Sequence, residues 1–241
     1  MILEMSFREK QARAQEKRDA ILAFLGSGEC YTSLQISSRV MSCSVRAARD
    51  TLDALIRDGA LKSESLFVQS RKIRIYGVTP HGLALVNEID RPYFELGRTN
   101  SSYVPHHLAT QTARLAAEAA GWSGWQPGKT IHKAGYLKVP DALATRPDGS
   151  RIAIEIERHV KTRKRYEEIF SLHLQEMSRK NWDEVHYLTK PELIIPLQNI
   201  FQRIVSIPVK GERVALEEKH RARFKFFSLP DWPQSQWETL S

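Results

Sequence analysis

Strict alternation of residue types between positions 151 and 157 constrains this chain most, because it defines both a strand and the faces of that strand. The side chains on one face are Ile152, Ile154 and Ile156, and those on the other are Ala153, Glu155 and Glu157. Successive side chains of a strand point to opposite sides of its sheet. The segment is therefore predicted to be a strand with one apolar face and two carboxylates on the other.

The residues before this strand predict a hairpin whose register decides whether a third carboxylate joins the glutamates. Residues 146–150 (RPDGS) have the composition of a turn. A five-residue loop pairs Thr145 with Arg151 and therefore Asp141 with Glu155. A two-residue loop would place Asp141 on the opposite face, since a shift of one residue reverses the side-chain direction. A shared acidic site thus requires an odd-length loop or a bulge.

Carboxylates at neighbouring strand positions repel one another, and a bound cation relieves that repulsion. The three candidates are Asp141, Glu155 and Glu157. Hard oxygen ligands suit Mg²⁺ or Mn²⁺, and such an ion can bind a scissile phosphate and lower the pKa of a water molecule. We therefore predict a metal site made of these three residues. The alternative is a solvated acidic edge without a ligand.

A basic segment follows the acidic strand directly. Five of the eight residues from Arg158 to Arg165 are lysine or arginine, a pattern that suits contacts to a DNA backbone. The candidate DNA contacts in this segment are Arg158, Arg163, Lys164, Arg165 and Tyr166. Tyr166 either stacks on a base or anchors the helix to the sheet, and the cations are otherwise an ordinary charged helix start.

The N-terminal third of the chain predicts three helices and a hairpin. The helices span about 9–26, 33–41 and 45–57, and β-like runs follow at 65–69 and 72–78. This order resembles the winged helix-turn-helix family over residues 9–80, in which the third helix enters the DNA major groove. The candidate DNA contacts are Ser44, Arg46, Arg49, Lys72 and Arg74. The alternative is a solvated helix face beside a charged hairpin.

The rest of the chain predicts a second, larger domain of mixed α/β class. Helices are expected at about 105–120, 162–179 and 191–204, and further strands near 137–144, 185–189, 205–209 and 223–229. This order suits a mixed sheet flanked by helices. The predicted organisation is therefore a winged helix at 1–90, a linker at 91–103 and an α/β domain at 104–241.

Composition excludes several classes of protein. The chain has 241 residues, a formal charge of +8, 41% hydrophobic residues and two cysteines. This apolar content argues against general disorder, and two cysteines are too few for a disulfide framework. No apolar run approaches the ~18 residues that a membrane span needs. We therefore expect a cytoplasmic protein without membrane insertion, and the basic surplus favours a polyanionic partner.

The acidic motif resembles that of the PD-(D/E)xK nuclease superfamily, whose domain has a restriction-endonuclease-like fold, over about residues 104–190. The resemblance implies that Asp141 and Glu155 bind the metal. The motif's lysine position holds Glu157, which would be a further metal ligand or a base for water, and the nearest substitute lysine is Lys161. In this superfamily the first helix often supplies a polar residue near the metal. His107 is the candidate for that role, and an ordinary helix-terminal histidine is the alternative.

The combined order is similar to that of the replication-relaxation family, and especially to MobC-type relaxases of mobilisable plasmids, over about residues 9–190. The residues that carry this resemblance are His107, Asp141, Glu155, Glu157, Lys161, Arg165 and Tyr166. It implies a sequence-specific nickase that acts at a plasmid origin of transfer, with an accessory mobilisation protein and a coupling protein as partners. The alternatives are a non-catalytic DNA-binding regulator with a degenerate nuclease domain, and a nuclease that cuts both strands.

Overall fold

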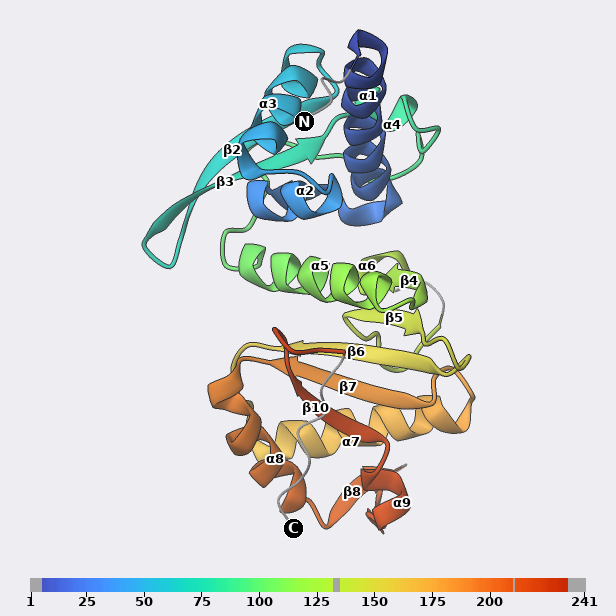
Figure 1. The fold of residues 1–241 in the computed structure, drawn as a ribbon. Helices are drawn as coiled ribbons and strands as arrows, with labels where there is room; N and C mark the ends of the chain where they lie inside the picture. The colour runs from blue at the N-terminus through green and yellow to red at the C-terminus, as the bar shows by residue number, and fades with distance from the viewer. Residues whose placement is uncertain (1–5, 132–134, 210, 234–241) are drawn as a thin grey trace, which may run out of the picture. The chain divides into compact units, whose positions relative to one another are not determined.

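The computed structural model describes residues 6–131, 135–209 and 211–233. The chain divides into two compact units, residues 1–112 and 113–241, and the division falls within helix α5 (Val104–Ala119). We call them the N-terminal and C-terminal units. Each is a mixture of helices and strands (Figure 1), as the sequence predicts for the chain as a whole.

The N-terminal unit has the predicted order of three helices and a hairpin. Its helices are α1 (Phe7–Phe24), α2 (Leu34–Val40) and α3 (Val45–Arg57), and the hairpin consists of β2 (Leu61–Val68) and β3 (Arg71–Val78). A short strand, β1 (Tyr31–Ser33), pairs with β3 to make an antiparallel sheet of order β1-β3-β2. Ala48, Leu52 and Leu55 form the buried face of α3, because residues three and four apart share one side of a helix.

The segment expected to be a linker packs on this sheet. After the short helix α4 (Pro80–Ala84), the backbone N–H of Phe94 donates to the carbonyl of Val78 at 2.8 Å. The Phe94 ring lies so close to Gly77 that a Cβ there would come within 2.0 Å of it. Residues 91–103 thus belong to the N-terminal unit, and the first half of α5 follows them there.

The C-terminal unit is built on a five-stranded mixed sheet of order β10-β7-β6-β5-β4. The central strands β6 (Arg151–Glu157) and β7 (Glu184–Thr189) are parallel, as are β7 and β10 (Phe224–Ser228), whereas β5 (Ala142–Thr145) and β4 (Ser123–Pro127) extend the sheet antiparallel. The sequence analysis does not predict strand β4. Its Trp125 is a good strand former, but Gly124 and Pro127 are poor ones.

Helices cover both faces of this sheet. In Figure 1, α7 (Arg163–Ser178) and α8 (Ile194–Gln202) lie on one side, and the part of α5 that belongs to this unit lies on the other. The main core forms on the α7 side, where Tyr166 and Phe170 pack with Tyr187 and Phe201. The strand expected at 205–209 is β8 (Ser206–Val209), which pairs with β9 (Glu212–Ala215) in a separate hairpin. Two short helices, α6 (Gly128–Ile131) and α9 (Glu218–Arg221), complete the unit.

The β5–β6 hairpin has the register that the five-residue loop predicts. Thr145 pairs with Arg151, and Ala142 pairs with Ile154. The loop is closed by Gly149, whose φ of 86° favours glycine, and by Asp148, which accepts hydrogen bonds from the N–H and hydroxyl of Ser150. Strand β5 begins after Asp141 rather than near residue 137. One cause is Pro140, which lacks the N–H that a strand interior requires.

Candidate functional site

Asp141 lies level with Glu155, directly before the first paired residue of β5. Its carboxylate accepts a hydrogen bond from the backbone N–H of Ile156 at 2.7 Å, so the side chain is fixed against β6. The charge of Asp141 also influences the pKa values of His173 and Tyr187, two groups in the core beneath α7. The hairpin therefore brings Asp141 to the side of the sheet on which Glu155 lies.

Glu155 forms a nearly buried ion pair that the sequence does not reveal. Its Oε1 lies 2.6 Å from Nζ of Lys138 and 3.2 Å from Nε2 of His173. Burial by itself would raise the pKa of Glu155, but the Lys138 ammonium and the His173 ring more than offset that effect and lower the pKa to about 2. Glu155 is thus a carboxylate anion throughout the physiological range.

His173 is a buried neutral base beside this pair. Its side chain has no exposed surface, and its ring lies among Trp182, Tyr187 and Phe224. Burial lowers the pKa of His173, and the nearby Glu155 opposes that shift only in part. Tyr166 and His173 are seven residues apart and therefore lie on the same face of α7. This spacing is the feature of the sequence from which His173 could have been predicted.

Glu157 has a second set of partners on the same strand face. Its Oε2 accepts hydrogen bonds from the Lys161 ammonium and from the Tyr166 hydroxyl, the latter at 3.0 Å. The Tyr166 hydroxyl also accepts from the backbone N–H of Lys161 at 3.1 Å. Lys161 therefore does reach the acidic strand, but its contact is with Glu157 and not with Glu155.

Tyr166 anchors α7 to the sheet. Its side chain is fully buried, and its ring packs on Phe201 with centroids 5.0 Å apart. Burial raises the pKa of its hydroxyl, which keeps the group a neutral hydrogen-bond donor. Because protein encloses the ring, Tyr166 has the anchoring role in this structure, and its ring is not presented for stacking on a base.

The other basic residues after Glu157 are only partly free to contact DNA. Arg163 pairs with Glu167 at 2.9 Å, and Arg165 pairs with Glu168 at 2.8 Å. The Arg165–Glu168 pair is exposed, and helix pairs of this spacing are weak. The Glu167 carboxylate is buried and also pairs with Arg213 at 2.9 Å. Within the described part of the chain, Arg158 and Lys164 have no ion pair.

His107 belongs to a different network, in the N-terminal unit. Its Nε2 lies 3.1 Å from the carbonyl oxygen of Tyr31 and 2.9 Å from the amide nitrogen of Gln111. That amide also donates to Glu29, at 3.0 Å. Within the N-terminal unit, His107 therefore has a packing role where α5 meets β1.

The predicted DNA contacts of the N-terminal unit lie on α3 and on the hairpin. The Ser44 hydroxyl caps α3 by accepting from the N–H of Ala47, and Arg46 and Arg49 are exposed. A groove between α3 and β3 is lined by Arg49, Lys72 and Arg74, among others. This groove therefore carries three of the five predicted contacts.

Arg74 is held in place by its neighbours. Its guanidinium donates to the Ser63 hydroxyl at 2.8 and 3.1 Å. It also lies 5.1 Å from the centre of the Tyr76 ring and 3.8 Å from Asp53. Such a guanidinium is ordered before any ligand binds, which lowers the entropy cost of a later contact.

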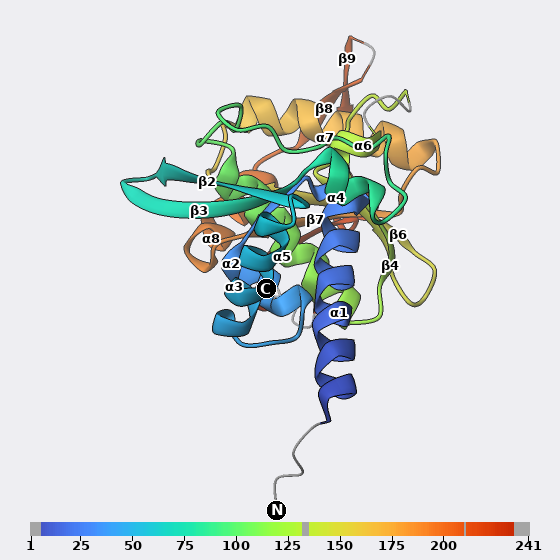
Figure 2. The same cartoon turned by 90° about the horizontal axis from the view of Figure 1, so that it is seen from above.

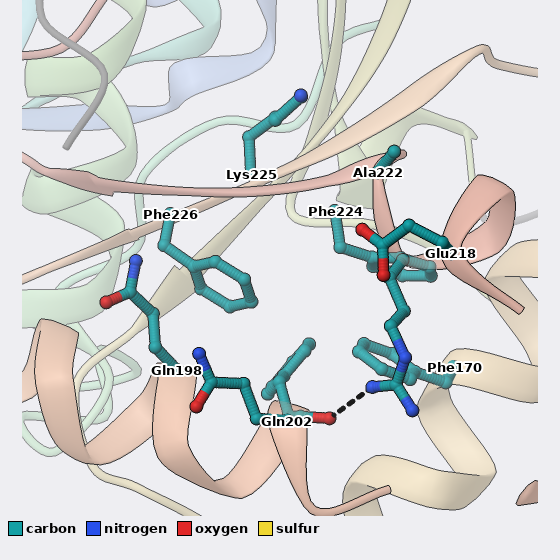
Figure 3. Close-up of a pocket in the computed structure, with 10 residues that line it drawn as sticks. Phe170, Gln198, Gln202, Glu218, Ala222, Phe224, Lys225 and Phe226 are labelled. Carbon is teal, nitrogen blue, oxygen red and sulfur yellow. Dashed lines mark hydrogen bonds between the residues drawn. The ribbon is translucent and has the colours of Figure 1, made fainter. Parts of the chain in front are cut away.

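The C-terminal unit also contains a cavity of about 340 Å³ that none of the predicted residues lines. Figure 3 shows its phenylalanine walls, including Phe170, Phe224 and Phe226, and the amides of Gln198 and Gln202 at its rim. The dashed line is the hydrogen bond from Arg221 to the carbonyl of Phe201, 2.9 Å long. The same carbonyl, at the end of α8, also accepts a hydrogen bond from the backbone N–H of Ile204 at 3.2 Å.

Two negative findings apply to the described residues. Among them, no group of three or more His, Cys, Asp or Glu side chains could hold a metal ion. In the same residues, no helix is both long and apolar enough to cross a membrane.

These features define a two-part protein, with N-terminal helices beside a small antiparallel sheet and an α/β unit that carries acidic residues on its five-stranded sheet. A model of the replication-relaxation family matches residues 22–185, which is more than half of the chain. The chain therefore belongs to the replication-relaxation family. No curated protein was found to match it. The family indicates a role connected with plasmid replication or relaxation and an interaction with DNA.

Proposed function

We propose that this protein is a sequence-specific DNA nickase, a relaxase of MobC type that acts at a plasmid origin of transfer. The observation that carries the proposal is the hairpin register, whose continuation past Ala142 and Ile154 brings Asp141 level with Glu155, the ion-pair partner of Lys138. The N-terminal unit would bind duplex DNA, and the C-terminal unit would cleave one strand. An accessory mobilisation protein and a coupling protein are the partners that this role requires.

The acidic site suits Mg²⁺ or Mn²⁺ only together with DNA. Mg²⁺ is commonly held by one or two carboxylates and by substrate phosphates, which agrees with the lack of a three-ligand group in the described residues. Asp141 and Glu155 would hold the ion, and Glu157 is bound to Lys161 and Tyr166 instead. When bound, the ion would lower the pKa of the attacking water and stabilise the leaving oxygen.

The chain's own residues would prepare the site in three ways. The low pKa of Glu155 keeps its carboxylate charged, so the ligand needs no deprotonation. Lys138, at 2.6 Å from Glu155, would neutralise a phosphate that approaches the same carboxylate. Lys161, held by Glu157, would supply a second cation next to Arg158 and Lys164.

A second candidate function is DNA binding without cleavage. The observation that favours it is that Lys138 and Lys161 already neutralise Glu155 and Glu157. Two lysine–glutamate pairs remove most of the repulsion that a metal would otherwise relieve. In that case the α/β unit would be a degenerate nuclease domain that supports a DNA-binding regulator.

A product assay separates the candidates. Purified full-length protein is incubated with Mn²⁺ and a supercoiled plasmid that carries the protein's own origin region. The nickase proposal expects open circles cut at one position on one strand. Linear plasmid would indicate a nuclease that cuts both strands, and a gel shift without any cleavage would support the regulator.

A further inference from the structure

The β2–β3 hairpin presents one side chain that the fold does not use. The hairpin turns tightly at Gln69 and Ser70, which have φ values of 47° and 65°. In the N-terminal unit it projects beyond the helices, as both views show (Figures 1 and 2). Near its tip, the side chain of Phe67 is 72% exposed. A phenylalanine side chain stabilises a fold by being buried, so Phe67 contributes little to the stability of this unit.

The strand pairing places Phe67 on the basic face of the hairpin. Phe67 pairs with Lys72, and Ser65 pairs with Arg74. Directly paired residues share a face of the sheet, so Phe67 lies beside both cations. On the opposite face, Leu66, Val68 and Ile73 pack towards the core of the unit.

The same face continues into the groove beside α3. Lys72 and Arg74 line that groove with Arg49 of α3. Lys72 and Arg74 thus share the face of the exposed Phe67 ring, and the groove that they line extends to Arg49 on α3. An apolar ring in such a setting matches the chemistry of a duplex, whose phosphates are anionic and whose base steps are apolar.

We propose that Phe67 is a wedge that inserts into the minor groove of duplex DNA next to the major groove occupied by α3. Arg49, Lys72 and Arg74 would bind the phosphates on either side of it. Insertion partly unstacks a base step and bends the duplex, which would favour sequences with deformable pyrimidine–purine steps. The inference rests on DNA binding by the N-terminal unit, as proposed above, and is independent of cleavage.

The test compares variants of the full-length chain on a short duplex that the wild-type protein selects from a random pool. The variants are Phe67→Ala, Phe67→Trp and Phe7→Ala. Phe7 is the matched control because it is 75% exposed in the same unit but lies at the start of α1. Affinity is measured by fluorescence anisotropy, and bending by energy transfer between dyes at the two ends of the duplex.

We expect Phe67→Ala to weaken binding about tenfold and to abolish the bend. Phe67→Trp should retain both properties, and Phe7→Ala should behave as wild type. If Phe67→Ala binds and bends the duplex as wild type does, the wedge is wrong although DNA binding stands. If the wild-type chain selects no duplex, DNA binding by this unit and the wedge are both wrong.

Discussion

Replacing Lys138 with methionine should destabilise the C-terminal unit, because it removes the main partner of a nearly buried carboxylate. The pKa of Glu155 is lowered from 4.5 to about 2, which corresponds to about 3 kcal/mol of stabilisation at neutral pH. The two side chains are only 19% and 13% exposed, so solvent screens the pair weakly. We therefore expect Lys138→Met to cost about 3 kcal/mol of unfolding free energy at pH 7.

The sign of the pH dependence follows from the direction of this shift. The folded pKa of Glu155 lies below its unfolded value, so the stabilisation is complete above about pH 4.5 and is lost as the pH falls towards 2. In Lys138→Met, burial dominates and raises the pKa of Glu155 instead. The difference in stability between wild type and variant should therefore shrink as the pH falls from 4.5.

Urea unfolding followed by tryptophan fluorescence measures this effect. All five tryptophans lie between residues 122 and 237, so the signal reports the C-terminal unit. A double-mutant cycle with Glu155→Gln should give a coupling of about 2–3 kcal/mol. Lys190→Met is the matched control, because Lys190 is 62% exposed and lies 3.9 Å from Glu192. A cost below about 1 kcal/mol for Lys138→Met, with no coupling, would refute the reasoning.

Two further predictions concern the core beneath α7 and the opposite face of the sheet. Burial lowers the pKa values of His173 and His186, so the unfolded chain binds protons that the folded chain excludes. Stability should fall below pH 6.5 by up to about 1.4 kcal/mol per pH unit for each histidine, and an unchanged urea midpoint between pH 7 and 5.5 would contradict this. Tyr166→Phe removes a buried hydrogen bond to Glu157 and should cost about 1–3 kcal/mol; full wild-type stability would show that the bond contributes nothing.

The register of the acidic hairpin could be predicted because turn chemistry and alternation act over a few residues. The residues Arg146 to Ser150 specify the loop locally, and that loop fixes the pairing of Thr145 with Arg151. Helix α3 could be predicted for the same reason, since its Ser44 cap and apolar periodicity are both contained within the helix.

The partners of the carboxylates could not be predicted, because they come from distant or irregular segments. Lys138 lies in a stretch without regular structure, where no periodicity indicates a side-chain direction. His173 reaches Glu155 only because α7 packs back on the sheet, which is a tertiary contact. His107 lies near the start of a helix, where a site residue was expected. In the N-terminal unit, however, its ring nitrogen contacts the Tyr31 carbonyl and the Gln111 amide.

The most direct test of the proposed catalytic centre is the single-turnover nicking rate of Asp141→Asn. Asparagine keeps an oxygen that can accept the hydrogen bond from Ile156 but loses the negative charge, so the variant should fold. Glu192→Gln, at a side chain 65% exposed in the same unit, is the control. We predict that Asp141→Asn nicks its plasmid at least about 100-fold more slowly, whereas the control keeps the wild-type rate. A folded Asp141→Asn protein that nicks at the wild-type rate would contradict the proposal.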